Sequence, residues 1–306
     1  MYNVALLALC LALGVALRYS KAVPENTAPV LNSFIINISL PALILLHVHQ
    51  LRPSFELVYP VLMPWAMFAV GFVFFRVAGH FVRWTPQSIG ALILTGSLAN
   101  TSFVGLPMIE AYYGNDNNEL ALGMLIDQLG TYLVLSTVGI LVAVLYSSSG
   151  QASLAAVGKK ILKFPPFLAL VAALALASGP VELPQGVDEV LERLGATLTP
   201  LALVSVGYQL RLSEIKGRFG QLSTGLLYSL VLAPAFILVF FSGLTGGAGG
   251  RIMHITVFEA AMPPQIGAAI VAMEHKLEPA LVALMVGIGI PLSFLTLFGW
   301  YYFLGG

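Results

Sequence analysis

Two clusters of polar, small and proline residues interrupt long apolar runs in this chain of 306 residues. Their amide and hydroxyl groups can hydrogen-bond an anion. A helix that starts beside such a cluster adds partial positive charge through its first backbone N–H groups. We therefore expect a binding site for a small organic carboxylate. The candidate substrate-binding residues are Asn100, Thr101, Ser102, Pro263, Pro264 and Gln265.

Two acidic residues lie in the apolar part of the chain, Glu259 just before the second cluster and Asp127 in the run that follows the first. An acid at the centre of a membrane helix costs roughly 2.5–3.5 kcal/mol on insertion scales, and burial disfavours its charged form. One interpretation of both acids is that they couple H⁺ or Na⁺ to transport. The other is structural: Glu259 braces a broken helix as a neutral acid, and Asp127 caps a neighbouring helix end.

The prolines of the two clusters indicate helix breaks. Proline lacks the backbone N–H and clashes with the carbonyl one turn back. Unpaired backbone groups at membrane depth are tolerated only against protein or a water-filled cavity. A simple proline kink would explain one cluster, but interruptions in both halves of the chain favour a binding site. The candidate hinge residues are Gly105, Pro107, Pro263, Pro264 and Gly267.

The composition is that of a membrane protein. Charged residues make up 9% of the chain, hydrophobic residues 58%, and the mean hydropathy is +0.91, whereas soluble domains have roughly 25% charged residues. The apolar runs are too long for a β-barrel, whose strands are about 10 residues of alternating pattern. The net charge of zero gives no sign of a nucleic-acid partner, and the single Cys10 argues against a disulfide or a cysteine metal site.

We predict an all-α integral membrane protein, because spans of roughly 20 residues leave room for about ten of them. The start of the chain lacks the basic region and cleavage site of a signal peptide, so we expect it to form the first span. The predicted spans are residues 2–18, 30–49, 57–80, 88–113, 119–146, 164–179, 189–210, 219–243, 251–273 and 279–303.

The two halves of the chain repeat each other. Gln50-Leu51-Arg52 corresponds to Gln209-Leu210-Arg211, and this offset of 159 residues persists downstream and makes Asn100 equivalent to Glu259. Because each half holds five spans, the two copies enter the membrane from opposite sides, which is the inverted repeat of secondary transporters. The predicted units are a first repeat over 1–146, a linking loop over 147–163 and a second repeat over 164–306.

Lysine and arginine predict the orientation. If the N-terminus lies outside, 11 of the 14 basic residues fall on the inner side and 3 on the outer side. Short inner loops carry the excess of these residues, so we expect both termini outside and the linking loop inside.

Several motifs together resemble the auxin efflux carrier family, and the resemblance covers nearly the whole chain. The motifs are Asn32-Ser33-Phe34, Ser39-Leu40-Pro41-Ala42-Leu43, Asn100–Pro107, Asp127-Gln128-Leu129-Gly130-Thr131 and Glu259–Pro264.

This resemblance implies a fold like that of bile-acid symporters and Na⁺/H⁺ antiporters, with helices 4 and 9 broken and crossing where the substrate binds. It implies a scaffold of spans 1, 2, 6 and 7, a transport domain of spans 3–5 and 8–10, an elevator-type movement and a homodimer. Family members carry auxin or small carboxylates such as malonate, malate or lactate. The short linking loop and Ala99, where plant exporters have proline, make this chain look like a prokaryotic carboxylate carrier of the bacterial inner membrane.

Other functions remain open on the sequence alone. With Glu259 and Asp127 as an ion site, the same fold would be a cation/proton exchanger. A membrane enzyme would need a nucleophile with a base or a metal cluster, and the five histidines are scattered near span ends. We therefore expect no enzyme activity and no cofactor beyond a coupling ion. The expected partners are the organic anion, the lipid bilayer and a second copy of the chain.

Overall fold

The computed structural model describes residues 2–48, 57–114, 117–147, 163–177, 184, 186–209, 217–245 and 250–305, and these contain helices and no β-strand. Long apolar runs favour helices because a helix satisfies its backbone groups within the segment, as the membrane interior requires. The helices are α1 (Tyr2–Ser20), α2 (Thr27–Phe34), η1 (Ile35–Ser39), α3 (Leu40–Val48), α4 (Val58–Val82), α5 (Pro86–Ser97), η3 (Thr101–Gly105), α6 (Leu106–Tyr113), α7 (Asn117–Leu125), η4 (Ile126–Tyr132), η5 (Leu135–Gly139), α8 (Ile140–Tyr146), α10 (Pro165–Ala177), α11 (Val187–Gly195), α12 (Leu198–Gln209), α13 (Phe219–Leu227), η6 (Tyr228–Leu232), α14 (Ala233–Thr245), α15 (Gly250–Ala260), α16 (Ile266–Glu274) and α17 (Pro279–Phe303).

Helices lie in every range where the sequence predicts a span, with ends within a few residues of the predicted ones. Six helical segments of the described chain are long and apolar enough to cross a membrane. They are Thr27–Val48, Val58–Val82, Asn118–Tyr146, Val187–Tyr208, Phe219–Leu244 and Pro279–Phe303. The α10 helix is apolar but shorter. Two further ranges are interrupted at the polar and proline clusters. Most of the linking loop, and the motif at Gln50-Leu51-Arg52, lie outside the described residues.

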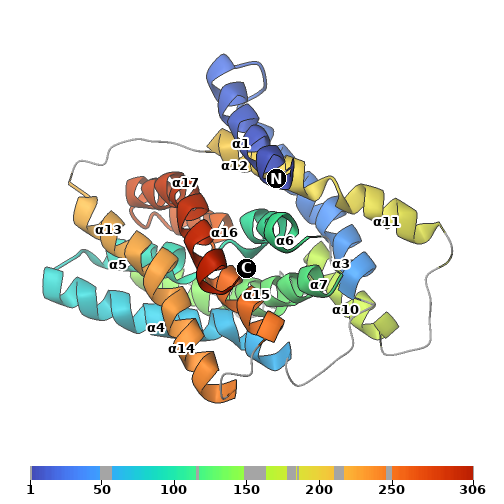
Figure 1. Ribbon diagram of the computed structural model, residues 1–306. Helices are drawn as coiled ribbons and strands as arrows, with labels where there is room; N and C mark the ends of the chain where they lie inside the picture. Colours follow the sequence, from blue (N-terminus) through green and yellow to red (C-terminus); the bar gives the residue numbers. More distant parts are fainter. Residues whose placement is uncertain are drawn as a thin grey trace.

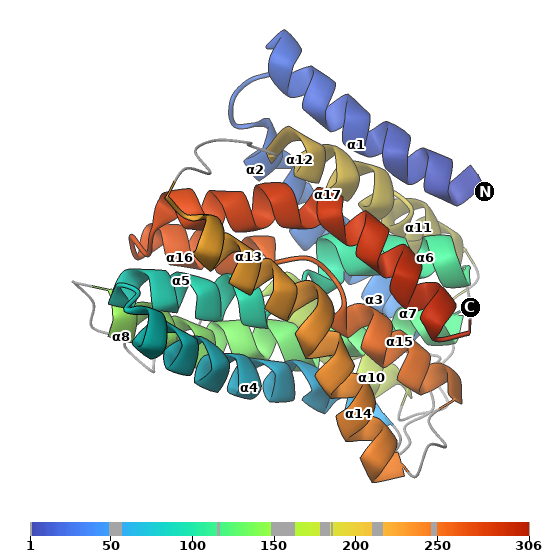
Figure 2. The same ribbon diagram turned by 60° about the vertical axis from the view of Figure 1, so that its left-hand side comes forward.

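The helices pack in two groups. In the first, α1 lies along α12, α2 also packs on α12, and α3 packs against α10 and α11. Figures 1 and 2 show α1 and α12 side by side at the edge of the molecule, away from α4 and α14. In the second group, α4–α8, η3–η6 and α13–α17 pack around one another. The groups meet where α3 contacts α7 and where α12 contacts η3.

Several spans contain a π-helical turn, marked η, in which the hydrogen-bond register widens and carbonyl groups lose their usual partners. Two tryptophans bond carbonyls of these turns. The indole N–H of Trp65 donates to the carbonyl of Leu129 in η4 at 3.2 Å, and that of Trp300 donates to Leu230 in η6 at 2.9 Å. These bonds tie α4 to η4 and α17 to η6, within the second group of helices.

Candidate functional site

The first interruption is a short extended stretch between α5 and η3. Helix α5 ends at Ser97 because Leu98 adopts extended backbone angles. Asn100 then starts η3 as its N-cap, and its side-chain Oδ1 accepts a hydrogen bond from the backbone N–H of Phe103 at 3.1 Å. Asparagine is among the strongest N-cap residues because it satisfies an N–H group that has no partner inside the helix.

The second interruption lies between α15 and α16. Helix α15 ends at Ala260, and Pro263 and Pro264 follow in non-helical backbone. Gln265 is the N-cap of α16, and its Oε1 accepts from the backbone N–H of Ala268 at 3.2 Å. Pro264 packs against Gly289 of α17, where a Cβ atom would lie 2.7 Å from the proline ring, so only glycine allows this approach.

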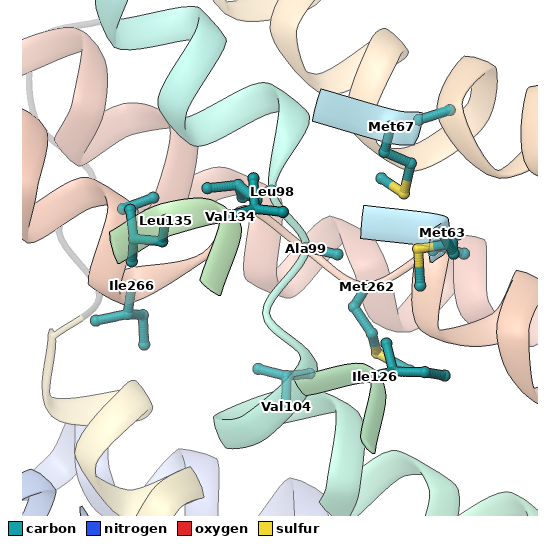
Figure 3. Packing of buried hydrophobic residues seen from close by; sticks show 14 of the residues in the cluster. Met63, Met67, Leu98, Ala99, Val104, Ile126, Val134, Leu135, Met262 and Ile266 are labelled. Carbon is teal, nitrogen blue, oxygen red and sulfur yellow. The ribbon is translucent and has the colours of Figure 1, made fainter. Parts of the chain in front are cut away.

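The two interruptions cross and hydrogen-bond to each other. Ala99 and Pro264 form an antiparallel bridge. The N–H of Asn100 donates to the carbonyl of Pro263 at 2.8 Å, and the N–H of Gln265 donates to the carbonyl of Leu98 at 3.1 Å. Each break therefore satisfies backbone groups of the other, as non-helical chain buried in a membrane protein requires. Figure 3 shows the apolar side chains around this crossing, including Leu98, Ala99 and Met262.

Two of the predicted hinge residues lie in a break, and the other three lie in helices next to the breaks. Pro263 and Pro264 lie in the second break, and Gly267 lies in the first turn of α16. Gly105 and Pro107 have a different place: both are helical, and the half-helix after the first break begins at Thr101, six residues before Pro107. The helix continues through Pro107 because η3 is a π-turn, in which the N–H of Gly105 bonds Asn100 five residues back.

Asp127 lies at the start of the η3 half-helix. Its Oδ1 accepts from the hydroxyls of Thr101 at 2.6 Å and Ser102 at 2.7 Å, and its Oδ2 accepts from the Nε2 of Gln128 at 2.6 Å. A carboxylate at a helix N-terminus is stabilised by the helix dipole. Asp127 is buried, with 2% of its surface exposed. A carboxyl group of the protein itself therefore lies at the helix N-terminus where the sequence predicts a bound anion.

Glu259 is fully buried in the last turn of α15, directly before the second break. Its carboxyl group lies against Gly105 of η3 and Gly123 of α7: a Cβ atom on Gly105 would be 2.5 Å from Oε2, and one on Gly123 would be 3.3 Å from Oε1. Neither carboxyl oxygen has a hydrogen-bond partner among the described residues. Such an arrangement leaves the acid available to bind a proton or an ion.

Further buried polar atoms without a partner in the described chain include the Nδ2 of Asn100, the Oε1 of Gln128 and the Oγ1 of Thr131. Thr131 and Gly123 are not among the site residues predicted from the sequence. A signal was present, because both lie four residues from Asp127 and therefore on the same helix face. Among the described residues, no three His, Cys, Asp or Glu side chains gather as a metal site.

A separate cavity of about 310 Å³ lies where the two groups of helices meet. Its lining comes from α3, α6, α7, α11 and α12 and includes the side chains of His47, Glu110, Glu192 and Thr199. The hydroxyl of Thr199 in α12 donates to Oε2 of Glu110 in α6 at 2.7 Å. This is a polar contact between the two groups of helices.

Comparisons with known proteins identify the family of the chain. The sequence profile of the family described as membrane transport protein matches residues 1–301. An uncharacterized transporter of Methanocaldococcus jannaschii is 24% identical over 286 residues, which cover 90% of each chain. An uncharacterized transporter of Methanothermobacter thermautotrophicus is 26% identical over 297 residues, covering 94% of this chain and 93% of the relative. This chain is thus a membrane transporter that belongs to the membrane transport protein family, the family of the auxin efflux carriers.

Proposed function

We propose that this transporter carries small organic carboxylates and binds them at the crossing of the two broken helices. The observation that carries the proposal is the hydrogen-bonded crossing itself, with Asn100 and Gln265 as caps. The Nδ2 of Asn100 is buried and has no partner in the described chain, so it is a donor free to meet a carboxylate oxygen. Leaving such a donor unpaired costs about 1–3 kcal/mol, which a bound substrate would recover.

The two half-helices differ in what they offer an anion. Asp127 already compensates the start of η3 and engages the hydroxyls of Thr101 and Ser102. The start of α16 is capped by the neutral amide of Gln265. We therefore propose that the substrate carboxylate binds between Asn100 and the N-terminus of α16. Thr101 and Ser102 then hydrogen-bond Asp127 and position it, and Pro263 and Pro264 keep the second break in a non-helical conformation.

For the whole molecule we propose ten spans in two inverted five-span repeats. The packing supports a division into a scaffold and a transport domain, because α1, α2–α3, α10 and α11–α12 contact one another and the remaining helices form the second group. The crossing belongs to the second group. In the proposed elevator mechanism this group moves past the first and carries the site across the membrane, while two copies associate through their scaffolds.

We further propose that the protein resides in the inner membrane of a prokaryote with both termini outside. The support is the excess of lysine and arginine in the loops that follow the odd-numbered spans. Fusion of alkaline phosphatase to the C-terminus should be active and fusion of green fluorescent protein should be dark. The opposite pattern would reverse the orientation.

A cation/proton exchanger is the second candidate, and one observation favours it. Asp127 and Glu259 are both buried, whereas no Lys or Arg is buried in the described part of the chain. The exchanger would move Na⁺ or respond to a pH gradient without any organic anion. Exchange that persists when Glu259→Gln and Asp127→Asn are combined would exclude these acids as its ion site.

A thermal-shift screen of the purified protein against small carboxylates tests the leading proposal. A ligand at about 100 times its Kd stabilises the folded state by about 2.7 kcal/mol. We expect one carboxylate class to raise the unfolding temperature of the wild type and of Asn37→Ala, which changes an exposed asparagine in η1. The shift should vanish in Asn100→Ala. Full substrate transport by Asn100→Ala would refute the site.

A further inference from the structure

Asp127 and Glu259, the two acids of the candidate site, have opposite surroundings. Asp127 accepts three hydrogen bonds, from Thr101, Ser102 and Gln128, so both of its oxygens act as acceptors, as those of an ionised carboxylate do. Glu259 accepts none from the described residues. Its carboxyl group lies against two glycines, and the aliphatic ends of Leu106 and Ile109 approach the same Gly123 within about 3 Å of a Cβ position. Glu259 is thus an acid in an apolar recess.

The charges around Glu259 would not stabilise a second negative charge. The elements packed against α15 are α4, α7, α14, α17 and η3. Their titratable side chains, with those of the adjoining η4 and α6 and of α15 itself, are Tyr59, Arg76, His80, Glu110, Tyr112, Tyr113, Glu119, Asp127, Tyr132, Arg251, His254, Tyr301 and Tyr302. Of these, Asp127 is the buried acid whose negative charge would oppose an ionised Glu259. Arg251 is committed to Glu119 at 2.7 Å, and its side chain is 57% exposed.

Sodium would need several oxygen ligands, and unwound backbone carbonyls commonly supply them in transporters. In the first break the carbonyls of Leu98, Ala99 and Asn100 already accept a backbone N–H. In the second break those of Pro263 and Gln265 do, whereas no backbone N–H of the described residues bonds those of Ala261, Met262 and Pro264. A proton needs only one carboxyl oxygen. The recess formed by Gly105 and Gly123 fits a protonated carboxyl group better than a hydrated or caged cation.

We propose that Glu259 is a proton-binding site, and that it must hold its proton when the substrate carboxylate binds, so that H⁺ and the organic anion cross the membrane together. This inference rests on the proposed function. Asp127 is already hydrogen-bonded to Thr101 and Ser102 at the start of η3. A substrate carboxylate next to Asp127 and an ionised Glu259 would place three negative charges in one buried site. Protonation of Glu259 removes one of them.

Thermodynamic linkage makes the two binding events reciprocal. If the carboxylate binds only to the form with Glu259 protonated, binding of the anion and of the proton strengthen each other equally. Above the pH at which Glu259 loses its proton, the Kd for the carboxylate rises about tenfold per pH unit. The isosteric Glu259→Gln mimics the protonated acid, so its Kd stays constant over the same pH range.

The proton site can be tested without a substrate. Dicyclohexylcarbodiimide reacts with protonated carboxyl groups in apolar surroundings, and peptide mass spectrometry locates the adduct. On the full chain in lipid nanodiscs we expect labelling of Glu259, slower at higher pH, and none of Asp127. Replacing K⁺ by Na⁺ at the same ionic strength should not change the rate. Glu259→Gln should remain folded and unlabelled at this position.

Three results would overturn the inference: protection of Glu259 by Na⁺, labelling of Asp127 as fast as that of Glu259, or a Kd that still depends on pH in Glu259→Gln. Protection by Na⁺ would assign a sodium site instead. Failure of every carboxylate to bind at any pH would refute the proposed function, whereas the labelling pattern decides on the proton site by itself.

Discussion

Asn100 and Gln265 cap two half-helices in the same way. Each side-chain carbonyl oxygen accepts a hydrogen bond from the backbone N–H three residues further along, at 3.1 Å for Phe103 and 3.2 Å for Ala268. Each backbone N–H also donates into the opposite break, Asn100 to Pro263 and Gln265 to Leu98. The two residues are therefore counterparts at the crossing, and a ligand between them would meet two amide side chains and two helix starts.

The first prediction separates the capping role of Asn100 from its role toward a ligand. In Asn100→Ser the hydroxyl can still cap η3, but the Nδ2 donor is lost. We expect Asn100→Ser to unfold near the wild-type temperature, whereas Asn100→Ala loses about 1 kcal/mol of stability with the cap. Both variants should lose carboxylate binding.

Differential scanning fluorimetry and binding of the carboxylate found in the screen measure the two effects. Substrate binding at wild-type affinity in Asn100→Ser would mean that Asn100 is only a cap. The ligand would then have to contact other groups at the crossing.

The second prediction concerns the recess that holds the Glu259 carboxyl group. A methyl group on Gly105 would lie 2.5 Å from one carboxyl oxygen and 2.7 Å from the other, so one group must move. We expect Gly105→Ala to lower the unfolding free energy by about 1–3 kcal/mol, as overpacking does. Gly299→Ala is the matched control, because its Cβ meets nothing within 4 Å. It should be neutral or stabilising by up to about 1 kcal/mol.

A shorter acid should relieve the strain. In the double variant with Glu259→Asp, the carboxyl group withdraws by one methylene. We expect a coupling energy of about 0.5–3 kcal/mol in the double-mutant cycle, read from unfolding in detergent. Additive effects of the two substitutions would show that Gly105 and Glu259 do not contact each other.

The third prediction concerns the charge of Asp127. In Asp127→Asn the amide cannot accept from Thr101, Ser102 and Gln128 together, and the negative charge at the start of η3 is lost. We expect a loss of about 1–3 kcal/mol in unfolding free energy, because hydrogen bonds to a buried charged group are among the strong ones. Glu192→Gln, an exposed acid of α11, should change stability by less than about 0.5 kcal/mol. Equal unfolding temperatures of the two variants would count against the capping role.

The positions of the helices could be predicted from the sequence because membrane thickness fixes the length of an apolar run. The interruptions could be predicted too, because prolines grouped with polar residues disfavour a continuous helix inside such runs. The residues at which the half-helices begin could not be predicted. Pro107 suggests the start of a half-helix, but the π-turn before it carries this proline inside a helix. Hydrogen-bond register is set by local packing and has no simple sequence signature.

The pairing of the halves shows a second limit. The repeat offset makes Asn100 equivalent to Glu259. In the structure, the residue that caps a half-helix as Asn100 does is Gln265, six residues after Glu259. An offset that aligns whole spans does not align a break whose length differs between halves. The bond between Asp127 and Thr101 joins residues of different spans, and no pattern within one span predicts it. Helical spacing from Asp127 could have added Gly123 and Thr131.

The last prediction tests the proposed elevator movement at the contact between the two groups of helices. Thr199 in α12 and Glu110 in α6 are joined by a hydrogen bond of 2.7 Å. If α6 slides past α12 during transport, a covalent link between these positions stops the cycle. In a Cys10→Ser background, we expect oxidative cross-linking of Thr199→Cys with Glu110→Cys to abolish carboxylate uptake, and reduction to restore it.

The matched control lies within one group of helices. Ser205 of α12 and Asn32 of α2 are also in hydrogen-bond contact, at 2.5 Å between their side-chain oxygens. Both belong to the proposed scaffold, so a cross-link between Ser205→Cys and Asn32→Cys should leave uptake unchanged. Gel mobility after protease cleavage between the halves gives the cross-linked fraction for both pairs. Undiminished uptake by a fully cross-linked 199–110 pair would rule out relative movement of α6 and α12, because a fixed contact cannot lie on a sliding interface.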